Sequence, residues 1–154
     1  MKNNYLKCIS AGEKIVLDPI ESKELIITAR DKFDFVFVSA SYGFNVPDKP
    51  TEKTEVEVLE IIKNGTLRDI FKSFGKNINR LCLTQSQIKQ FSEKYVEWFL
   101  DNKGTFFLLK GKNQIFILYV RRNFGMMYID MCDYGIVNRV LKAKDKRCFI
   151  VPKL

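Results

Sequence analysis

The chain of 154 residues contains no histidine. This absence excludes Ser–His and Cys–His nucleophilic pairs, His-ligated zinc or iron, and imidazole acid–base catalysis. A glycine-rich phosphate loop is missing too, since no Gly-x-x-x-x-Gly-Lys-Ser/Thr pattern occurs. Any catalysis would depend on carboxylates, Lys, Arg, Tyr or Cys. We therefore expect no cofactor and no bound metal, and we favour a protein without enzymatic activity.

Cysteine is scarce, and its spacing forms no metal or redox motif. The four thiols belong to Cys8, Cys82, Cys132 and Cys148. None of them lies in a Cys-x-x-Cys pair, and each has an apolar neighbour along the chain, such as Ile9, Leu81, Met131 or Phe149. We expect reduced, buried thiols that pack as small hydrophobic side chains rather than disulfides.

No apolar run approaches the roughly 20 residues that a membrane-spanning helix needs. The longest, residues 114–120, is followed directly by Arg121 and Arg122. The N-terminal residues also lack the apolar core and small-residue cleavage site of a secretory signal. We therefore expect a cytoplasmic protein that does not contact membranes.

The composition is typical of one globular domain. Hydrophobic residues make up 46% of the chain and charged residues 29%, which excludes a disordered chain. A chain of this length forms about one domain with its own core. Its thirteen Phe predict a core rich in aromatic rings, each burying about 150–250 Å².

The net charge of +8 is distributed unevenly. Residues 1–100 contain 15 Lys and Arg against 14 Asp and Glu, whereas residues 101–154 contain 11 against 4. A cationic region of this kind favours a polyanionic partner, because each neutralised phosphate releases counterions. A solvated Lys-rich surface would produce the same pattern.

Residues 1–62 are expected to be mostly β. In residues 5–10, Tyr5, Lys7 and Ile9 alternate with Leu6, Cys8 and Ser10, and residues 14–17 follow a turn at Gly12, which predicts an N-terminal β-hairpin. The Asp18-Pro19 pair would end its second strand.

The rest of this region is less regular. Residues 24–29 fit either a short strand or a helical turn, and the apolar run 35–38 predicts a strand. Turn-forming residues predict a loop over 39–53. Within residues 54–61, the first five alternate polar and apolar side chains, which favours a half-buried strand, although the Glu residues also suit a helix.

Residues 66–100 are expected to form two helices. The first covers about 67–74, with Thr66 as its N-cap, Asp69 three residues later, and Gly75 ending it. The second covers about 86–100, with a capping box formed by Thr84 and Gln87. Its apolar stripe consists of Ile88, Phe91, Tyr95 and Trp98 or Phe99, and its solvent-facing residues are Lys89, Glu93, Lys94 and Glu97.

Residues 104–152 are expected to form antiparallel β-structure, with strands over 105–110, 114–122, 126–132 and 148–151. The second strand is apolar on both faces, so it should be central and covered on both sides. The third should direct Met127, Ile129 and Met131 inward and Tyr128 and Asp130 outward. The whole chain, 1–154, is thus predicted to be a single α+β domain, in which a C-terminal meander packs against two helices and an N-terminal β-hairpin.

Four ordered segments carry a family resemblance. They are NVPDKPTEKT at 45–54, LCLTQSQI at 81–88, GTFFLLK at 104–110 and RCFIVPKL at 147–154. Together they resemble a family of short, uncharacterised proteins of ultra-small candidate-phylum bacteria, which share a VP-x-KPT-x-x-T loop, a LCLTQ-x-QI helix start, a GTFFLFK strand and a C-terminal VVVPQL. The resemblance covers nearly the whole chain and implies residence in a bacterial cytoplasm, with no particular activity. Residues 133–147 depart from the pattern in being richer in Lys.

Cations and aromatic rings alternate on and after the predicted meander. The candidate nucleic-acid-binding residues are Lys110, Lys112, Arg121, Arg122, Phe124, Tyr128, Tyr134, Arg139, Lys142, Lys144, Lys146 and Arg147. Cations contact the phosphate backbone and rings stack on bases, as a β-surface that binds single-stranded RNA or DNA requires. Tyr119 lies in the same stretch but on a strand expected to be buried. Our first hypothesis is a non-catalytic nucleic-acid-binding protein.

Two other hypotheses remain open. A protein–protein adaptor would use an acidic face at Glu52, Glu55, Glu57 and Glu60 together with the loop over 42–50. A histidine-free ribonuclease would stabilise phosphate charge with Arg139 or Arg147 and use Tyr128 or Tyr134 as acid or base. No residue spacing requires either of them.

Overall fold

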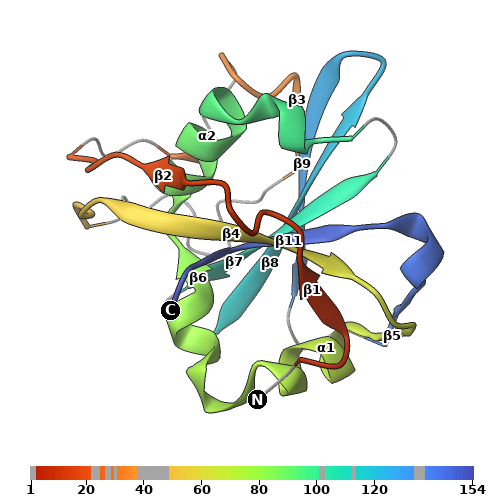
Figure 1. Cartoon of the computed structure of the whole chain (residues 1–154). Helices are drawn as coiled ribbons and strands as arrows, with labels where there is room; N and C mark the ends of the chain where they lie inside the picture. The colour runs from red at the N-terminus through yellow and green to blue at the C-terminus, as the bar shows by residue number, and fades with distance from the viewer. Residues whose placement is uncertain are drawn as a thin grey trace.

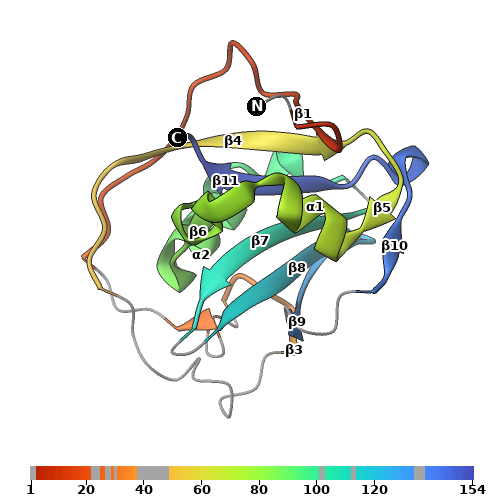
Figure 2. The same cartoon turned by 90° about the horizontal axis from the view of Figure 1, so that it is seen from below.

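The computed structural model describes residues 3–21, 25–26, 29, 31–37, 49–100, 103–111, 114–133 and 138–154, without the side chains of Asn77, Cys132 and Asp133. Within these ranges the chain is one α+β domain, as predicted. A large twisted sheet lies between the helices α1 (Leu67–Ser73) and α2 (Gln85–Lys94), which occupy opposite sides of it (Figures 1 and 2).

The described strands of the main sheet number nine. They are β1 (Leu6–Cys8), β2 (Ile15–Leu17), β3 (Phe35–Phe37), β4 (Thr54–Ile61), β6 (Cys82–Leu83), β7 (Gly104–Lys110), β8 (Ile115–Asn123), β9 (Met126–Asp133) and β11 (Cys148–Pro152). The spatial order is β1-β4-β11-β7-β8-β9-β3, with β2 also on β4 and β6 also on β7. The short strands β5 (Gly65–Thr66) and β10 (Val140–Leu141) form a separate antiparallel pair, which the sequence did not predict.

The predicted C-terminal meander is confirmed for β7, β8 and β9, which pair antiparallel in sequence order. The fourth predicted strand, β11, is not its continuation: it lies parallel to β7 and antiparallel to β4. The central position of β8 is confirmed. Phe116 and Leu118 pack into the core on the α2 side, whereas Ile117 packs into the core on the α1 side.

The ambiguity at residues 54–61 is resolved in favour of a strand. Val56 and Val58 are buried on the α2 side, and Leu59 and Ile61 on the α1 side. The prediction for 35–38 is also confirmed, since β3 covers Phe35–Phe37. The predicted loop over 39–53 and the segment 24–29 lie largely outside the described residues.

The predicted N-terminal β-hairpin is wrong in its pairing. β1 and β2 lie where expected, but each pairs antiparallel with β4 and neither with the other. Because β4 offers one long edge, the two short strands follow each other along it. Residues 10–14 loop out between them, with Gly12 at φ +90°. The Ser10 hydroxyl holds this interruption in place by accepting a 2.9 Å hydrogen bond from the Val58 N–H.

Both predicted capping boxes are confirmed. In α1 the Thr66 side chain accepts from the Asp69 N–H, and the Asp69 carboxylate accepts from the Thr66 N–H. In α2, Thr84 and Gln87 make the equivalent pair. After α1 the chain continues as a 3₁₀ helix over Gly75–Leu81, because Gly75 adopts φ +68° and so interrupts the α-helix.

The helix α2 ends at Lys94 rather than near residue 100 as predicted. The Tyr95 hydroxyl accepts from the Val16 N–H and donates to the Val16 carbonyl, which ties this turn to β2. Tyr95 itself leaves helical geometry, and a 3₁₀ turn over Val96–Trp98 follows. This change of direction still places Phe99 in the core.

Lys89 corrects the prediction for the outer face of α2. It is only 8% exposed, and its Nζ lies 3.2 Å from a carboxylate oxygen of Asp31 and 3.2 Å from one of Glu93. Ile26 and Ala29 pack against the same core as α2. Asp31 thus lies against a part of the helix that the sequence pattern assigned to solvent.

The core is aromatic, as predicted. The fully buried phenylalanines are Phe33, Phe71, Phe91, Phe99, Phe107 and Phe149. Phe149 of β11 lies between elements: its ring is 4.9 Å from that of Phe106 and 5.7 Å from that of Phe71, measured between centroids. It thereby joins the sheet to α1.

Three thiols fall within the described side chains, and all are free: Cys8, Cys82 and Cys148. Burial raises the pKa of Cys82 to about 11 and that of Cys148 to about 12, so both remain protonated at neutral pH. The side chain of Cys132 lies outside the described part. No described helix is long and apolar enough to cross a membrane.

Candidate nucleic-acid interface

The sheet has an open surface over β8, β9 and β3 on the side where α1 lies. On the opposite side the same strands are closed, since Val120 and Ile129 are fully buried. On the α1 side, Phe35 is 40% and Phe37 is 57% exposed. Two exposed phenylalanines on one face of a sheet whose other face is core make this face a candidate contact surface.

The strand register aligns an aromatic and cationic row on this surface. Phe35 of β3 pairs with Tyr128 of β9, and Tyr128 pairs with Arg121 of β8. The rings of Phe35 and Tyr128 stack at 4.5 Å with an interplanar angle of 10°, and Phe37 stacks parallel to Phe35 at 6.3 Å. The Arg121 guanidinium lies 4.9 Å from the centre of the Tyr128 ring. We call Phe37, Phe35, Tyr128 and Arg121 the open row.

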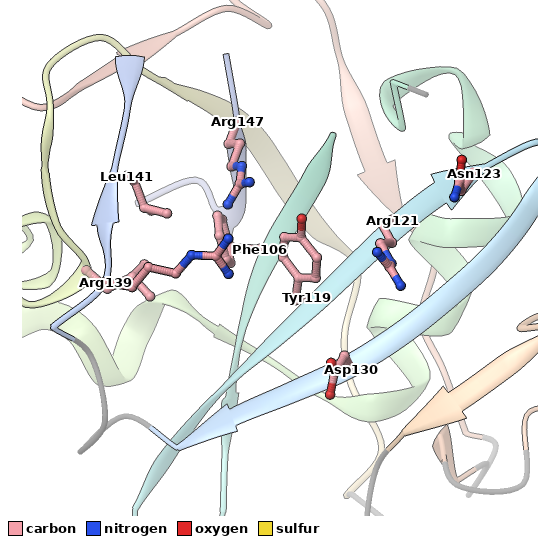
Figure 3. A pocket seen from close by; sticks show the side chains of 9 residues that line it. Phe106, Tyr119, Arg121, Asn123, Asp130, Arg139, Leu141 and Arg147 are labelled. Atoms are coloured by element: carbon pink, nitrogen blue, oxygen red, sulfur yellow. The ribbon is translucent and has the colours of Figure 1, made fainter. Parts of the chain in front are cut away.

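The open row leads into a pocket of about 400 Å³. Three guanidinium groups reach it from separate segments: Arg121 from β8, Arg139 from the residues before β10, and Arg147 from those before β11. In Figure 3 the side chains of Arg139 and Arg147 extend toward Phe106 and Tyr119, with Arg121 beyond Tyr119. We call this the arginine pocket.

Backbone pairing fixes the two arginines that come from outside the meander. The Arg147 carbonyl accepts a 2.9 Å hydrogen bond from the Ile61 N–H, which anchors it to the end of β4. The Arg139 carbonyl accepts from the Leu67 N–H at 3.4 Å, at the start of α1. The Arg147 guanidinium also lies 5.8 Å from the centre of the Tyr119 ring. Contacts between distant segments therefore assemble the pocket.

The arginine pocket is strongly cationic. Asp130 is its one acidic lining residue. Within the part of the chain that the structure describes, none of Arg121, Arg139 and Arg147 lies within ion-pair distance of a carboxylate. Three guanidinium groups directed at one cavity without paired carboxylates are arranged to bind an anion.

Gly104 makes room for the Tyr119 ring at the floor of this pocket. A Cβ at position 104 would overlap that ring. We predict that Gly104→Ala displaces Tyr119 and lowers the free energy of unfolding by about 1–3 kcal/mol, the usual cost of overpacking. Urea denaturation in a double-mutant cycle tests this, because the same substitution should cost little in a Tyr119→Ala background. An equal cost in both backgrounds would contradict the prediction.

Only some of the predicted candidates come together. Arg121, Arg139 and Arg147 share the arginine pocket, and Tyr128 adjoins it through Arg121.

The other candidates lie elsewhere. Arg122 is on the opposite face of β8 from Arg121, in line with buried Val120. Phe124 is 88% exposed at the tip of the β8–β9 turn, and Lys110 is at the far end of β7. Three exposed lysines lie between β10 and β11 and do not line the pocket: Lys142, Lys144 and Lys146. Lys112 and Tyr134 fall outside the described residues.

Sequence reasoning missed Phe35 and Phe37 as site residues. The run was interpreted only as an apolar strand. Its alternation with Val36, which packs against the core, was the available signal that the two rings share the other face. Nothing local indicated that this face is open.

The structure does not bring together the residues proposed for the adaptor or for the ribonuclease. Glu55 and Glu57 lie on the α1 side of β4, whereas Glu60 lies on the other side, so the proposed acidic face is divided. Tyr128 contacts Arg121 rather than Arg139 or Arg147, the two arginines considered for a ribonuclease. Among the described residues, no three His, Cys, Asp or Glu side chains are grouped to hold a metal ion.

No known protein family, curated protein or solved structure matches this chain. The family resemblance of its four motifs therefore stays a prediction, and the function must be inferred from the arrangement of its own residues.

Proposed function

We propose that this protein binds single-stranded nucleic acid across the open row and the arginine pocket, without catalysis, and that it does so in the cytoplasm. The observation that carries the proposal is the placement of parallel exposed rings and three arginines without paired carboxylates on one sheet face. A duplex hides the faces of its bases, whereas a single strand offers them for stacking.

The two parts of the site serve different parts of the ligand. Phe35 and Phe37 are the exposed rings of the open row, on which each stacked base contributes about 1–3 kcal/mol regardless of sequence, whereas the Tyr128 ring is already in contact with Phe35 and Arg121. Arg121 joins the two parts, since it contacts the Tyr128 ring and also lines the pocket. Its cation can neutralise a phosphate beside a stacked base.

We predict salt-sensitive binding with a preference for single strands. If the site neutralises about three phosphate charges of the ligand, raising the salt concentration from about 50 to about 200 mM weakens binding about 20-fold. Fluorescence anisotropy with labelled single-stranded RNA, single-stranded DNA and duplex DNA, each of about 12 nucleotides, measures both effects. Arg121→Glu should reduce the affinity at least tenfold, because it reverses a charge at the junction of row and pocket.

The chain provides a matched control in Arg122→Glu. It makes the same charge change one residue away on the opposite face, and should leave binding within about threefold of the unaltered protein. Thermal melting of both variants verifies folding. Equal losses from the two variants, or no binding at the lower salt concentration, would contradict the proposed function.

A further inference from the structure

The arginine pocket lies where the open surface ends. Leu141 of β10 lines the pocket on the side away from Asp130 of β9 (Figure 3), and Leu67 at the start of α1 is also a lining residue. The pair β5–β10 and α1 cover the sheet beyond that point (Figure 2). A nucleic-acid strand that crosses β3, β9 and β8 in turn therefore cannot continue past β7.

The three positive charges of the arginine pocket exceed the single negative charge of an internal phosphodiester linkage. A phosphodiester carries one negative charge, whereas a terminal phosphomonoester carries close to two at neutral pH and offers three oxygens. Guanidinium groups bind such oxygens through paired, charge-assisted hydrogen bonds. Arg121, Arg139 and Arg147 together match the terminal group better than the internal one.

We propose that the arginine pocket holds the terminal phosphate of the single strand whose bases stack on the open row. This inference rests on the proposed function and adds the end of the strand to its ligand class. The volume of about 400 Å³ is within the range that accommodates a small ligand, so it admits the terminal nucleotide as well as its phosphate.

Polar groups at the edge of the pocket suit the rest of a nucleotide. Asp130 supplies acceptor oxygens, and Asn123 supplies an amide at the opposite edge from Arg139 (Figure 3). Hydroxyl and amino groups of a sugar and base are donors that the exposed Asp130 carboxylate can bind.

The test compares three forms of one internally labelled RNA: with a 5′-phosphate, with a 3′-phosphate, and with hydroxyl groups at both ends. We expect one phosphorylated form to bind at least tenfold more tightly than the hydroxyl form, the difference that a few charge-assisted hydrogen bonds produce. Whether the 5′-phosphate or the 3′-phosphate tightens binding shows in which direction the RNA runs across the sheet. Arg139→Gln combined with Arg147→Gln should abolish this gain, so that the phosphorylated and hydroxyl forms bind that variant with equal affinity.

Lys142→Gln combined with Lys144→Gln is the matched control, because it removes the same charge from exposed positions outside the pocket. The tighter binding of the phosphorylated RNA should persist in that variant. Equal binding of all three forms would overturn the inference and leave the proposed function standing. If the unaltered protein binds none of the three forms, both the inference and the proposed function are overturned. A gain that persists without Arg139 and Arg147 would place the phosphate elsewhere.

Discussion

Replacing Phe35 and Phe37 together with alanine is expected to weaken the binding of single-stranded RNA about 30-fold or more, because the loss of stacking for two bases exceeds about 2 kcal/mol. Both rings are substantially exposed, so the effect on folding should be much smaller than the effect on binding. Fluorescence anisotropy at low salt measures the affinity, and thermal melting measures the stability of the same variant.

Phe124→Ala is the control for that experiment. Phe124 is the most exposed aromatic residue of the described chain, at 88%, and it is outside the open row. Its removal should change RNA affinity less than threefold. An abasic oligonucleotide adds a second check, since the Phe35 and Phe37 substitutions should cost little when no base is present to stack. A loss equal to that of Phe124→Ala would remove the open row from the binding surface.

Phe149→Ala is expected to produce the largest loss of stability, about 3–5 kcal/mol in the free energy of unfolding. The Phe149 ring is fully buried and contacts the rings of Phe71, Phe74 and Phe106. Its removal leaves a cavity between the sheet and α1 that these rings fill only in part. That cost is a large share of the 5–15 kcal/mol by which a typical domain is stable.

Urea or guanidinium denaturation measures this loss. Phe149→Leu keeps most of the side-chain volume and should cost less than about 1.5 kcal/mol, so it remains measurable if the alanine variant does not fold. Phe124→Ala again provides a baseline, with a change of about 0.5 kcal/mol or less expected for an exposed position. A loss below about 1 kcal/mol for Phe149→Ala would show that this ring does not join the two layers as described.

Local features of the fold were predictable from the sequence. The capping boxes at Thr66 and Thr84 depend on hydrogen bonds between residues three positions apart, so their signal is contained in a few residues. The meander is similar, because short turns join β7, β8 and β9 and leave few alternative pairings. The burial of β8 on both faces followed from its apolar composition.

Features that depend on distant segments were not predictable in the same way. The residues on either side of the Gly12 turn indicated two strands but could not show that both would pair with β4. Helical spacing placed Lys89 on the outside of α2, because it carries no information about the segment near Ala29 that packs beside it. In both cases, contacts between segments that are distant along the chain decided the outcome.

The candidate site likewise combines residues that the sequence indicated with residues that only distant contacts bring together. Composition alone identified Arg121, Arg139 and Arg147 among the cations of the last third of the chain. It could not separate them from Arg122 or Lys110, because the face of a strand and the end of a strand are set by register and by neighbours. Phe35 and Phe37 joined the site only through the parallel pairing of β3 with β9.

The position of β11 has a consequence for how the molecule folds. Among the described strands, β11 is the only connection between the group β1, β2 and β4 and the group β3, β6, β7, β8 and β9. A ribosome produces residues 148–152 after all the other strands of the sheet. The local hairpins of β7, β8 and β9 can form early, and β1 and β2 can pair with one edge of β4, whereas the other edge of β4 must wait for β11, which is distant along the chain. The two halves of the sheet therefore join only after residues 148–152 have been synthesised, and the arginine pocket, which takes Arg147 from the start of that strand, is completed in the same step.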